Sequence, residues 1–213
     1  MNIILFGPPG AGKGTQAQFI VNKHNYFQLS TGNLLRDETK QNTDLGKEIE
    51  NLISDGKFVS DEIVNTLLEQ SINNLKFRDR IIFDGYPRNV EQAINLEKIL
   101  AKFDQNIGRI IFLNVSRDII EKRIMGRMYC EKCDMILNKF FDKSEIELHP
   151  CGKDYLVKRM DDNLNTVIAR YDTYIKTTKP VLNFYSKYEN FYTIDGSGEI
   201  EEISSQINKI LKV

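Results

Sequence analysis

The segment Gly7-Pro8-Pro9-Gly10-Ala11-Gly12-Lys13-Gly14-Thr15 decides the fold of this chain. It follows the apolar run Ile3-Ile4-Leu5-Phe6, which we expect to be a strand, and it leads into a stretch with helical character. A strand, a glycine-rich turn and the start of a helix form a cradle for phosphate groups, because backbone N–H groups point inward and the helix dipole favours an anion. Glycine is needed in the turn since a Cβ atom would hold the backbone away from the ligand. The spacing therefore predicts a phosphate-binding loop in which Lys13 reaches the outer phosphates.

One position of this loop differs from the general motif. That motif places serine or threonine directly after the lysine, where the hydroxyl group binds magnesium. Here Gly14 stands at that position, and the hydroxyl group follows at Thr15. We therefore expect magnesium to depend more on the phosphates of the nucleotide, on water and on a carboxylate from elsewhere in the chain.

The composition is that of an ordinary globular domain, with 213 residues, 41% hydrophobic residues and a net charge of −1. A chain of this length supports one substantial core with smaller inserted lobes. The charge balance offers no basic field for nucleic acid, and no apolar run approaches the length of a membrane span. The N-terminus enters a strand without a signal-peptide pattern, so we expect a cytoplasmic location. We also expect a monomer, because neither a coiled coil nor an apolar docking face is evident.

Predicted strands and helices alternate along the chain. The apolar runs and helical periodicities indicate strands at residues 2–6, 27–29, 80–84, 109–115 and 191–194 and helices at residues 13–24, 90–103, 118–125, 161–185 and 199–211. Such alternation predicts an α/β fold, with a parallel β-sheet covered by helices on both faces and ligands at the carboxyl ends of the strands. The long helix at 161–185 is expected to bend near Pro180.

Two stretches interrupt this alternation. Residues 30–59 are polar and helical, and residues 126–163 are irregular and contain all three cysteines. We interpret both as lobes inserted into one core, which consists of residues 1–29, 60–125 and 164–213.

The segment Asp84-Gly85-Tyr86-Pro87-Arg88 places a carboxylate at the end of a buried strand. A buried carboxylate is costly unless it has a partner, and hydrated magnesium would suit Asp84. Gly85 allows close approach, and Arg88 extends over the same edge of the sheet. Six arginines flank the predicted lobes or strand ends: Arg36, Arg88, Arg123, Arg127, Arg159 and Arg170. Arginine binds phosphate oxygens with a charged fork, so this distribution favours phosphoryl transfer, in which catalysis is mostly positioning and charge stabilisation.

The cysteines are spaced like metal ligands. Cys130 and Cys133 form one ligand pair, and Cys151 with Asp154 forms a second pair across a loop. This spacing suits tetrahedral zinc, which we prefer to iron. His149 competes with Asp154 for the fourth position, and we prefer Asp154 because His149 lies so near Cys151 in sequence. A site closed by four protein ligands is structural, and it would stabilise a lobe that has little core of its own.

Taken together, these motifs resemble the adenylate kinase family over the whole chain, and in particular its long-lid bacterial form with a zinc-binding lid. The resemblance rests on residues 7–15, Ser30-Thr31-Gly32 with Arg36, residues 84–88 with Gln92, Gly126-Arg127, Arg159-Met160-Asp161-Asp162-Asn163, Arg170 and Asp195-Gly196. It implies a phosphate-loop core with two mobile lobes, one binding the nucleoside monophosphate (residues 30–59) and one a lid (residues 126–163). The implied reaction is Mg-ATP + AMP ⇌ 2 ADP.

The resemblance also assigns residues to roles. It implies ATP contacts at Gly10, Ala11, Gly12, Lys13, Gly14, Thr15, Arg123, Arg127, Ile136, Leu137 and Gly198. It implies AMP contacts at Thr31, Arg36, Lys57, Phe58, Val59, Gly85, Tyr86, Pro87, Arg88, Gln92, Arg159 and Arg170, with Gln92 reading the adenine edge. The implied catalytic residues are Lys13, Arg88, Arg123, Arg159 and Arg170. Asp84 would hold Mg²⁺ through water, and Zn²⁺ would be bound by Cys130, Cys133, Cys151 and Asp154.

Ile136 and Leu137 replace a usual polar–aromatic pair of the family, so the lid's contact with adenine is expected to be apolar.

The sequence leaves two other functions open. A kinase for another nucleoside monophosphate, such as UMP or CMP, differs from an adenylate kinase in only a few pocket atoms. A zinc-ribbon nucleic-acid-binding module attached to an ATPase is the second alternative, and the net charge of −1 counts against it.

Overall fold

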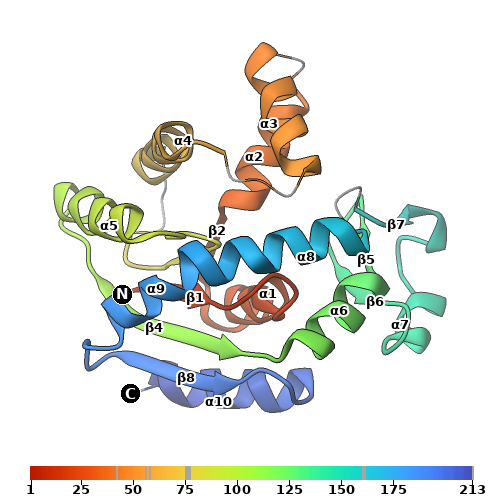
Figure 1. The fold of residues 1–213 in the computed structure, drawn as a ribbon. Helices are drawn as coiled ribbons and strands as arrows, with labels where there is room; N and C mark the ends of the chain where they lie inside the picture. The colour runs from red at the N-terminus through yellow and green to blue at the C-terminus, as the bar shows by residue number, and fades with distance from the viewer. Residues whose placement is uncertain (42, 56, 58, 75–77, 160–161, 213) are drawn as a thin grey trace.

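The computed structural model describes residues 1–41, 43–55, 57, 59–74, 78–159 and 162–212 (Figure 1). Over this part of the chain, the centre is a five-stranded sheet in the order β2-β3-β1-β4-β8, and every pairing in it is parallel. Its strands are β1 (Asn2–Phe6), β2 (Phe27–Ser30), β3 (Ile81–Asp84), β4 (Ile107–Asn114) and β8 (Phe191–Asp195). The predicted α/β fold with a parallel sheet is confirmed.

The side chains of the central strands are buried on both faces of the sheet. Ile3 and Leu5 belong to one core cluster, whereas Ile4 and Phe6 belong to another, because successive side chains of a strand point to opposite faces. The apolar run Ile3-Ile4-Leu5-Phe6 is therefore fully buried, as expected for a parallel sheet covered on both sides. Asp84 pairs in register with Leu5 of β1 and Ser30 of β2, so the polar end of β3 meets the ends of its neighbours.

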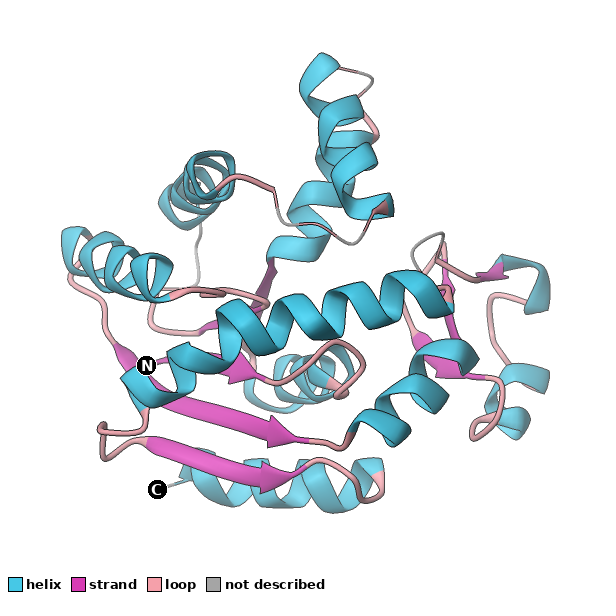
Figure 2. Cartoon of the chain, in the orientation of Figure 1, coloured by secondary structure: helices cyan, strands magenta, loops and turns pink. Residues whose placement is uncertain are grey.

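Helices cover both faces of this sheet (Figure 2). The cluster containing Ile3 and Leu5 includes side chains from α1 (Lys13–His24), α6 (Arg117–Gly126) and α10 (Ile200–Lys212). The other cluster includes side chains from α4 (Asp61–Asn74), α5 (Val90–Lys102) and α9 (Lys179–Tyr185). The sequence reading assigned no helix to residues 61–74, so α4 is an addition from the structure.

The C-terminal half of the predicted long helix has a more complex form. α8 (Leu164–Thr173) is followed by a π-helical segment (Tyr174–Thr178) and then by α9, with Pro180 in the first turn of α9. The prediction of one helix bent near Pro180 is therefore incomplete. Proline lacks an N–H group, and the wider π-helical turn lies directly before it. Tyr174 and Thr178 of this segment line the cleft described below.

The two stretches that interrupt the alternation lie beside the sheet. α2 (Thr31–Thr39) and α3 (Asp44–Ser54) project from the carboxyl end of β2 (Figure 1). Each begins at a hydroxyl cap, since Ser30 and Thr43 accept hydrogen bonds from N–H groups three residues later. The stretch after α6 forms a small antiparallel sheet in the order β6-β5-β7, with β5 (Arg127–Cys130), β6 (Ile136–Asn138), β7 (Leu156–Val157) and the short helix α7 (Lys143–Glu147).

Candidate active site

A cleft of about 810 Å³ opens at the carboxyl ends of the central strands. Ligands of open parallel sheets bind in this position, where loops after neighbouring strands converge. Thr31 and Gln92 are not among the lining residues, and Phe58 lies outside the described residues. All other predicted nucleotide, magnesium and catalytic positions line the cleft: Gly10, Ala11, Gly12, Lys13, Gly14, Thr15, Arg36, Lys57, Val59, Asp84, Gly85, Tyr86, Pro87, Arg88, Arg123, Arg127, Ile136, Leu137, Arg159, Arg170 and Gly198.

The loop between β1 and α1 forms the floor of the cleft. Gly10 has a φ of +80°, and a Cβ atom there would lie 2.7 Å from Cγ1 of Ile124. Gly12 begins α1 with a φ of +92° and offers no side chain to cap the helix. The first N–H groups of α1 are therefore left to an incoming anion, as the phosphate-loop motif requires.

Lys13 folds back over this loop. Its Nζ donates to the carbonyl oxygens of Gly7 at 2.8 Å and Pro8 at 3.0 Å. The pKa of Lys13 is lowered to about 8, chiefly because burial disfavours its charged form. Asp84 opposes this shift, whereas Arg88 and Arg170 add to it. The ammonium group of Lys13 therefore lies among other positive charges, and these charges together favour the binding of an anion between them.

Asp84 and Arg88 occupy the turn after β3. One carboxylate oxygen of Asp84 accepts a hydrogen bond from Nε2 of Gln28 at 2.9 Å. Nε of Arg88 donates to the carbonyl oxygen of Gly85 at 2.7 Å, and Oγ1 of Thr31 donates to the same oxygen at 3.0 Å. Burial lowers the pKa of Arg88 to about 10, with a further contribution from the nearby Arg170. Thr31 thus acts behind the turn, as a support for Gly85.

Arginines from other parts of the chain add further positive charge to the cleft. Arg123 donates to the carbonyl oxygens of Gly196 at 2.7 Å and Gly198 at 3.3 Å. Arg127 forms a bidentate pair with the buried carboxylate of Asp162. The guanidinium of Arg159 lies over the ring of Tyr129, 5.7 Å from its centre. These contacts hold the three arginines, all of which line the cleft.

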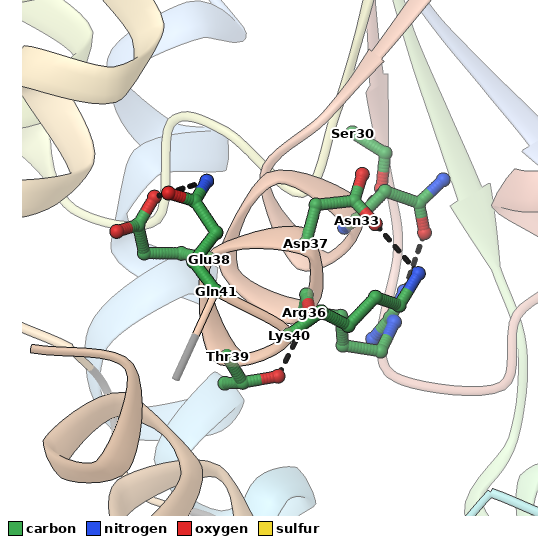
Figure 3. Close-up of polar contacts among 8 residues, drawn as sticks. All are labelled: Ser30, Asn33, Arg36, Asp37, Glu38, Thr39, Lys40 and Gln41. Atoms are coloured by element: carbon green, nitrogen blue, oxygen red, sulfur yellow. Dashed lines mark hydrogen bonds and ion pairs between the residues drawn. The ribbon is translucent and has the colours of Figure 1, made fainter. Parts of the chain in front are cut away.

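Arg36 lies in the last turn of α2 and lines the cleft. Figure 3 shows its polar contacts. Its Nη2 donates to Oδ1 of Asn33 at 2.5 Å, and its carbonyl oxygen accepts from Oγ1 of Thr39 at 2.8 Å. A Cβ atom on Gly32 would lie 3.3 Å from Nη2 of Arg36, so the glycine leaves room for the guanidinium. The bond to Asn33 orients the Arg36 side chain.

The small antiparallel sheet reaches over the phosphate loop. Cδ1 of Ile136 would lie 3.2 Å from a Cβ atom on Gly14, and Nε2 of Gln18 in α1 donates to the carbonyl oxygen of Asp134 at 3.1 Å. The apolar side chain of Ile136 therefore lies against the start of α1.

The cysteine cluster differs from its prediction at one position. Ligand atoms of Cys130, Cys133, Cys151 and His149 all lie within 4.8 Å of one another, and in the described part of the chain Asp154 does not belong to this group. The structure thus groups His149, and not the preferred Asp154, with the three cysteines. The chain between β6 and β7, which includes α7, folds His149 back toward the first cysteine pair, and Nε2 of His149 lies 3.7 Å from Sγ of Cys133.

This group has the chemistry of a zinc site. Thiolates and an imidazole are ligands that zinc prefers, and tetrahedral bonds of about 2.0–2.3 Å place the ligand atoms roughly 3.5 Å apart. Nδ1 of His149 is buried and finds no hydrogen-bond partner among the described residues. Three sulfur atoms and an imidazole nitrogen within 4.8 Å of one another are a donor set that fits a bound metal ion.

The structure also shows supporting residues that sequence reasoning missed. They are Gln28 behind Asp84, Asp162 behind Arg127, and Asp61 behind Gln92. Gln92 is buried, and its amide bonds to Asp61 and to the backbone N–H of Arg88. Each of these supporting contacts joins residues that lie far apart in sequence, so no local pattern could have shown them.

Comparison with known proteins places the chain in a family. The family profile described as "Adenylate kinase" matches residues 5–190. A protein of Pelagibacter ubique named adenylate kinase is 76% identical over 213 residues, covering 100% of both chains. Adenylate kinases of Mycoplasma capricolum and Erythrobacter litoralis are 40% and 39% identical, again over 100% of both chains. Among the described residues, no helix combines the length and apolar character that a membrane crossing requires. With its phosphate loop and its ring of arginines in one cleft, the chain belongs to the adenylate kinase family.

Proposed function

We propose that this chain catalyses the reversible transfer of a phosphoryl group between adenine nucleotides, Mg-ATP + AMP ⇌ 2 ADP. The observation that carries the proposal is the single cleft in which the phosphate loop faces Arg36 and Arg88. Two nucleotides with their phosphates toward each other need positive charge between them, and Lys13, Arg88 and Arg170 are close enough to perturb one another there. The family membership and the 76% identical relative support this reading.

The cleft supplies a place for each substrate. The N–H groups at the start of α1 and Lys13 would hold the ATP phosphates, with Arg123, Arg127, Ile136, Leu137 and Gly198 on the lid side. Arg36, Lys57, Val59 and the turn 85–88 would hold AMP, whose phosphate attacks directly, so no side chain needs to act as a nucleophile. Arg88, Arg159 and Arg170 would stabilise charge on the transferred group.

Magnesium fits the donor set at the floor of this cleft. The carboxylate of Asp84 and the hydroxyl of Thr15 line the same space, and hard oxygen ligands are those that magnesium prefers. Bound there with ATP, magnesium would neutralise phosphate charge, and Asp84 would hold it through water. Gln28 orients Asp84 for this role through its hydrogen bond.

The test is an assay of ADP formation from ATP with AMP, UMP or CMP as the acceptor. We expect AMP to be preferred by orders of magnitude. Comparable rates with UMP would replace the adenylate assignment with a kinase for another nucleoside monophosphate. A crystal grown with a bisubstrate dinucleotide should show both nucleotides in the cleft, and room for only one would contradict the proposal.

We further propose that residues 30–59 and 126–163 move as two lobes on the core, and that their closure excludes water from the transferred group. Their projection from the sheet supports this division (Figure 1). Relaxation dispersion in the presence of substrates would detect the exchange. A cytoplasmic location and a monomeric state are part of the same proposal.

The lid is proposed to carry a structural zinc ion on Cys130, Cys133, His149 and Cys151. The small core around the site, formed by Cys130, Leu137 and Leu156, supports this, because so few apolar side chains stabilise little by themselves. Four protein ligands would leave no position for substrate, so the metal would act on stability.

The ligand assignment gives a prediction with a built-in control. His149→Asn should lose bound zinc and melt at a lower temperature, whereas Asp154→Asn should keep both zinc and melting temperature. Cys130→Ser should behave like His149→Asn, and all three variants should retain most activity at low temperature. Metal analysis and thermal melts on the same samples measure this, and zinc loss in Asp154→Asn alone would return the fourth position to Asp154.

The lowered pKa of Lys13 predicts proton uptake on ATP binding. Without nucleotide the pKa is about 8, and added phosphate charge should raise it. At a pH between about 8 and 9 the free protein is partly deprotonated at Lys13, so binding should take up a proton. At about pH 7 Lys13 is already mostly protonated, and the uptake should shrink. Calorimetry in buffers with different ionisation enthalpies measures the uptake, and it should be absent at both pH values in Lys13→Met.

A further inference from the structure

Asp61 joins the two walls of the proposed AMP site. It is the first residue of α4, two positions after Val59, which lines the cleft. One oxygen of its carboxylate accepts from Nδ2 of Asn89 at 2.7 Å, and the other accepts from Nε2 of Gln92 at 2.5 Å. A single half-buried side chain thus bridges the segment after the first lobe and the first turn of α5.

Both partners of Asp61 are tied to the turn that carries Arg88. Oε1 of Gln92 accepts from the backbone N–H of Arg88 at 2.7 Å, and Oδ1 of Asn89 accepts from the backbone N–H of Gln92 at 2.7 Å. Gln92 has a relative exposure of 4%, so water cannot readily replace these partners. The contacts form a closed network between Asp61 and the backbone at Arg88.

The network permits one orientation of the Gln92 amide. A carboxylate can only accept hydrogen bonds, and a backbone N–H can only donate. The NH₂ group of Gln92 must therefore face Asp61, and its oxygen must face Arg88. Without the carboxylate the amide could turn, and the N–H of Arg88 would then face a second donor.

We propose that Asp61 is a positioning residue, which holds the Arg88 turn against the wall formed by Lys57 and Val59 through Gln92 and Asn89. This inference rests on the proposed function, because it assigns Asp61 to the AMP side of the reaction. Asp61 is not among the residues that line the cleft. Its loss should free the turn that carries Arg88, while the phosphate loop on the ATP side stays in place.

The kinetic signature separates this role from a merely structural one. A variant that only destabilised the fold would lower the active fraction and leave both Michaelis constants unchanged. A positioning role instead raises KM for AMP and lowers kcat, with KM for ATP unchanged within about twofold. We expect KM for AMP to rise about tenfold or more in Asp61→Ala. The rise should be smaller in Asp61→Asn, whose remaining oxygen can keep one of the two bonds.

The experiment measures both Michaelis constants for wild type, Asp61→Ala, Asp61→Asn, and the adjacent exposed control Glu62→Gln. A double-mutant cycle adds Gln92→Leu and Asp61→Ala/Gln92→Leu, with thermal melts on all six proteins. In the Gln92→Leu background only the path through Asn89 remains, so we expect Asp61→Ala to raise KM for AMP by less than it does in wild type. Independent effects in the cycle, equal changes for ATP and AMP, or an unchanged KM for AMP in Asp61→Ala would each overturn the inference. A wild-type protein that transfers no phosphoryl group to AMP would overturn the proposed function as well.

Discussion

Lys13→Met should reduce turnover by about a thousandfold or more while the protein remains folded. The ammonium group lies at the floor of the cleft, bonded to the carbonyl oxygens of Gly7 and Pro8. From there it can stabilise the negative charge of the phosphoryl group as that group moves from ATP to the acceptor. Methionine has a similar volume but lacks the positive charge of the ammonium group. Because burial and the neighbouring arginines already oppose the ammonium in the free protein, its removal should not unfold the chain.

The control for this variant is Lys23→Met on the same helix. Lys23 is exposed near the far end of α1, where its ammonium lies 5.2 Å from the centre of the Phe19 ring. We expect Lys23→Met to keep nearly full activity. Steady-state assays with saturating ATP and AMP, together with far-UV circular dichroism, compare the two variants. Turnover near that of wild type in Lys13→Met would remove the lysine from the mechanism.

Arg88→Ala should have an effect of similar size, about a thousandfold on kcat/KM for AMP. The guanidinium is held by Gly85, and burial together with Arg170 lowers its pKa to about 10. It therefore stays protonated at neutral pH and meets the acceptor phosphate with a fixed fork of donors. Alanine removes the fork and leaves the hydrogen bond from its backbone N–H to Gln92 intact.

Arg80→Ala provides the matched control. Arg80 is exposed and directly precedes β3, at the end of the strand away from the cleft. We expect its substitution to leave both Michaelis constants and kcat close to those of wild type. Initial rates over a matrix of ATP and AMP concentrations separate the two effects. An Arg88→Ala enzyme with an unchanged kcat/KM for AMP would place the acceptor phosphate elsewhere.

Local chemistry explains what the sequence could predict. The phosphate loop combines an apolar run, glycines with positive φ and a lysine within a few residues, so strand, turn and helix start are all specified nearby. The turn at Asp84 is equally local. By contrast, β5, β6 and β7 have two to four residues each, which is too few for the sequence to show a strand periodicity.

The proposed fourth zinc ligand could not be predicted from sequence spacing. The sequence favours Asp154 because Cys151 and Asp154 have the same spacing as Cys130 and Cys133. The path of the chain between β6 and β7 decides which side chain lies near the cysteines, and it places His149 there. Asp61 behind Gln92 and Asp162 behind Arg127 lie about thirty positions from their partners, and only the folded chain brings them together. Most nucleotide positions were implied by the resemblance to a known family, whereas the contacts that hold them are shown only by the three-dimensional arrangement.

The strand order has a consequence for the folding of the chain during its synthesis on the ribosome. β1 is made first, yet its hydrogen-bonding neighbours are β3 and β4, and the second of these ends at Asn114. At a synthesis rate of about 5–20 residues per second, the central strand waits roughly 5–20 seconds before both neighbours exist. During that interval the run Ile3-Ile4-Leu5-Phe6 is an unpaired apolar edge in the nascent chain. Chaperones that shield emerging apolar segments should therefore raise the yield of active enzyme most strongly when translation is slow.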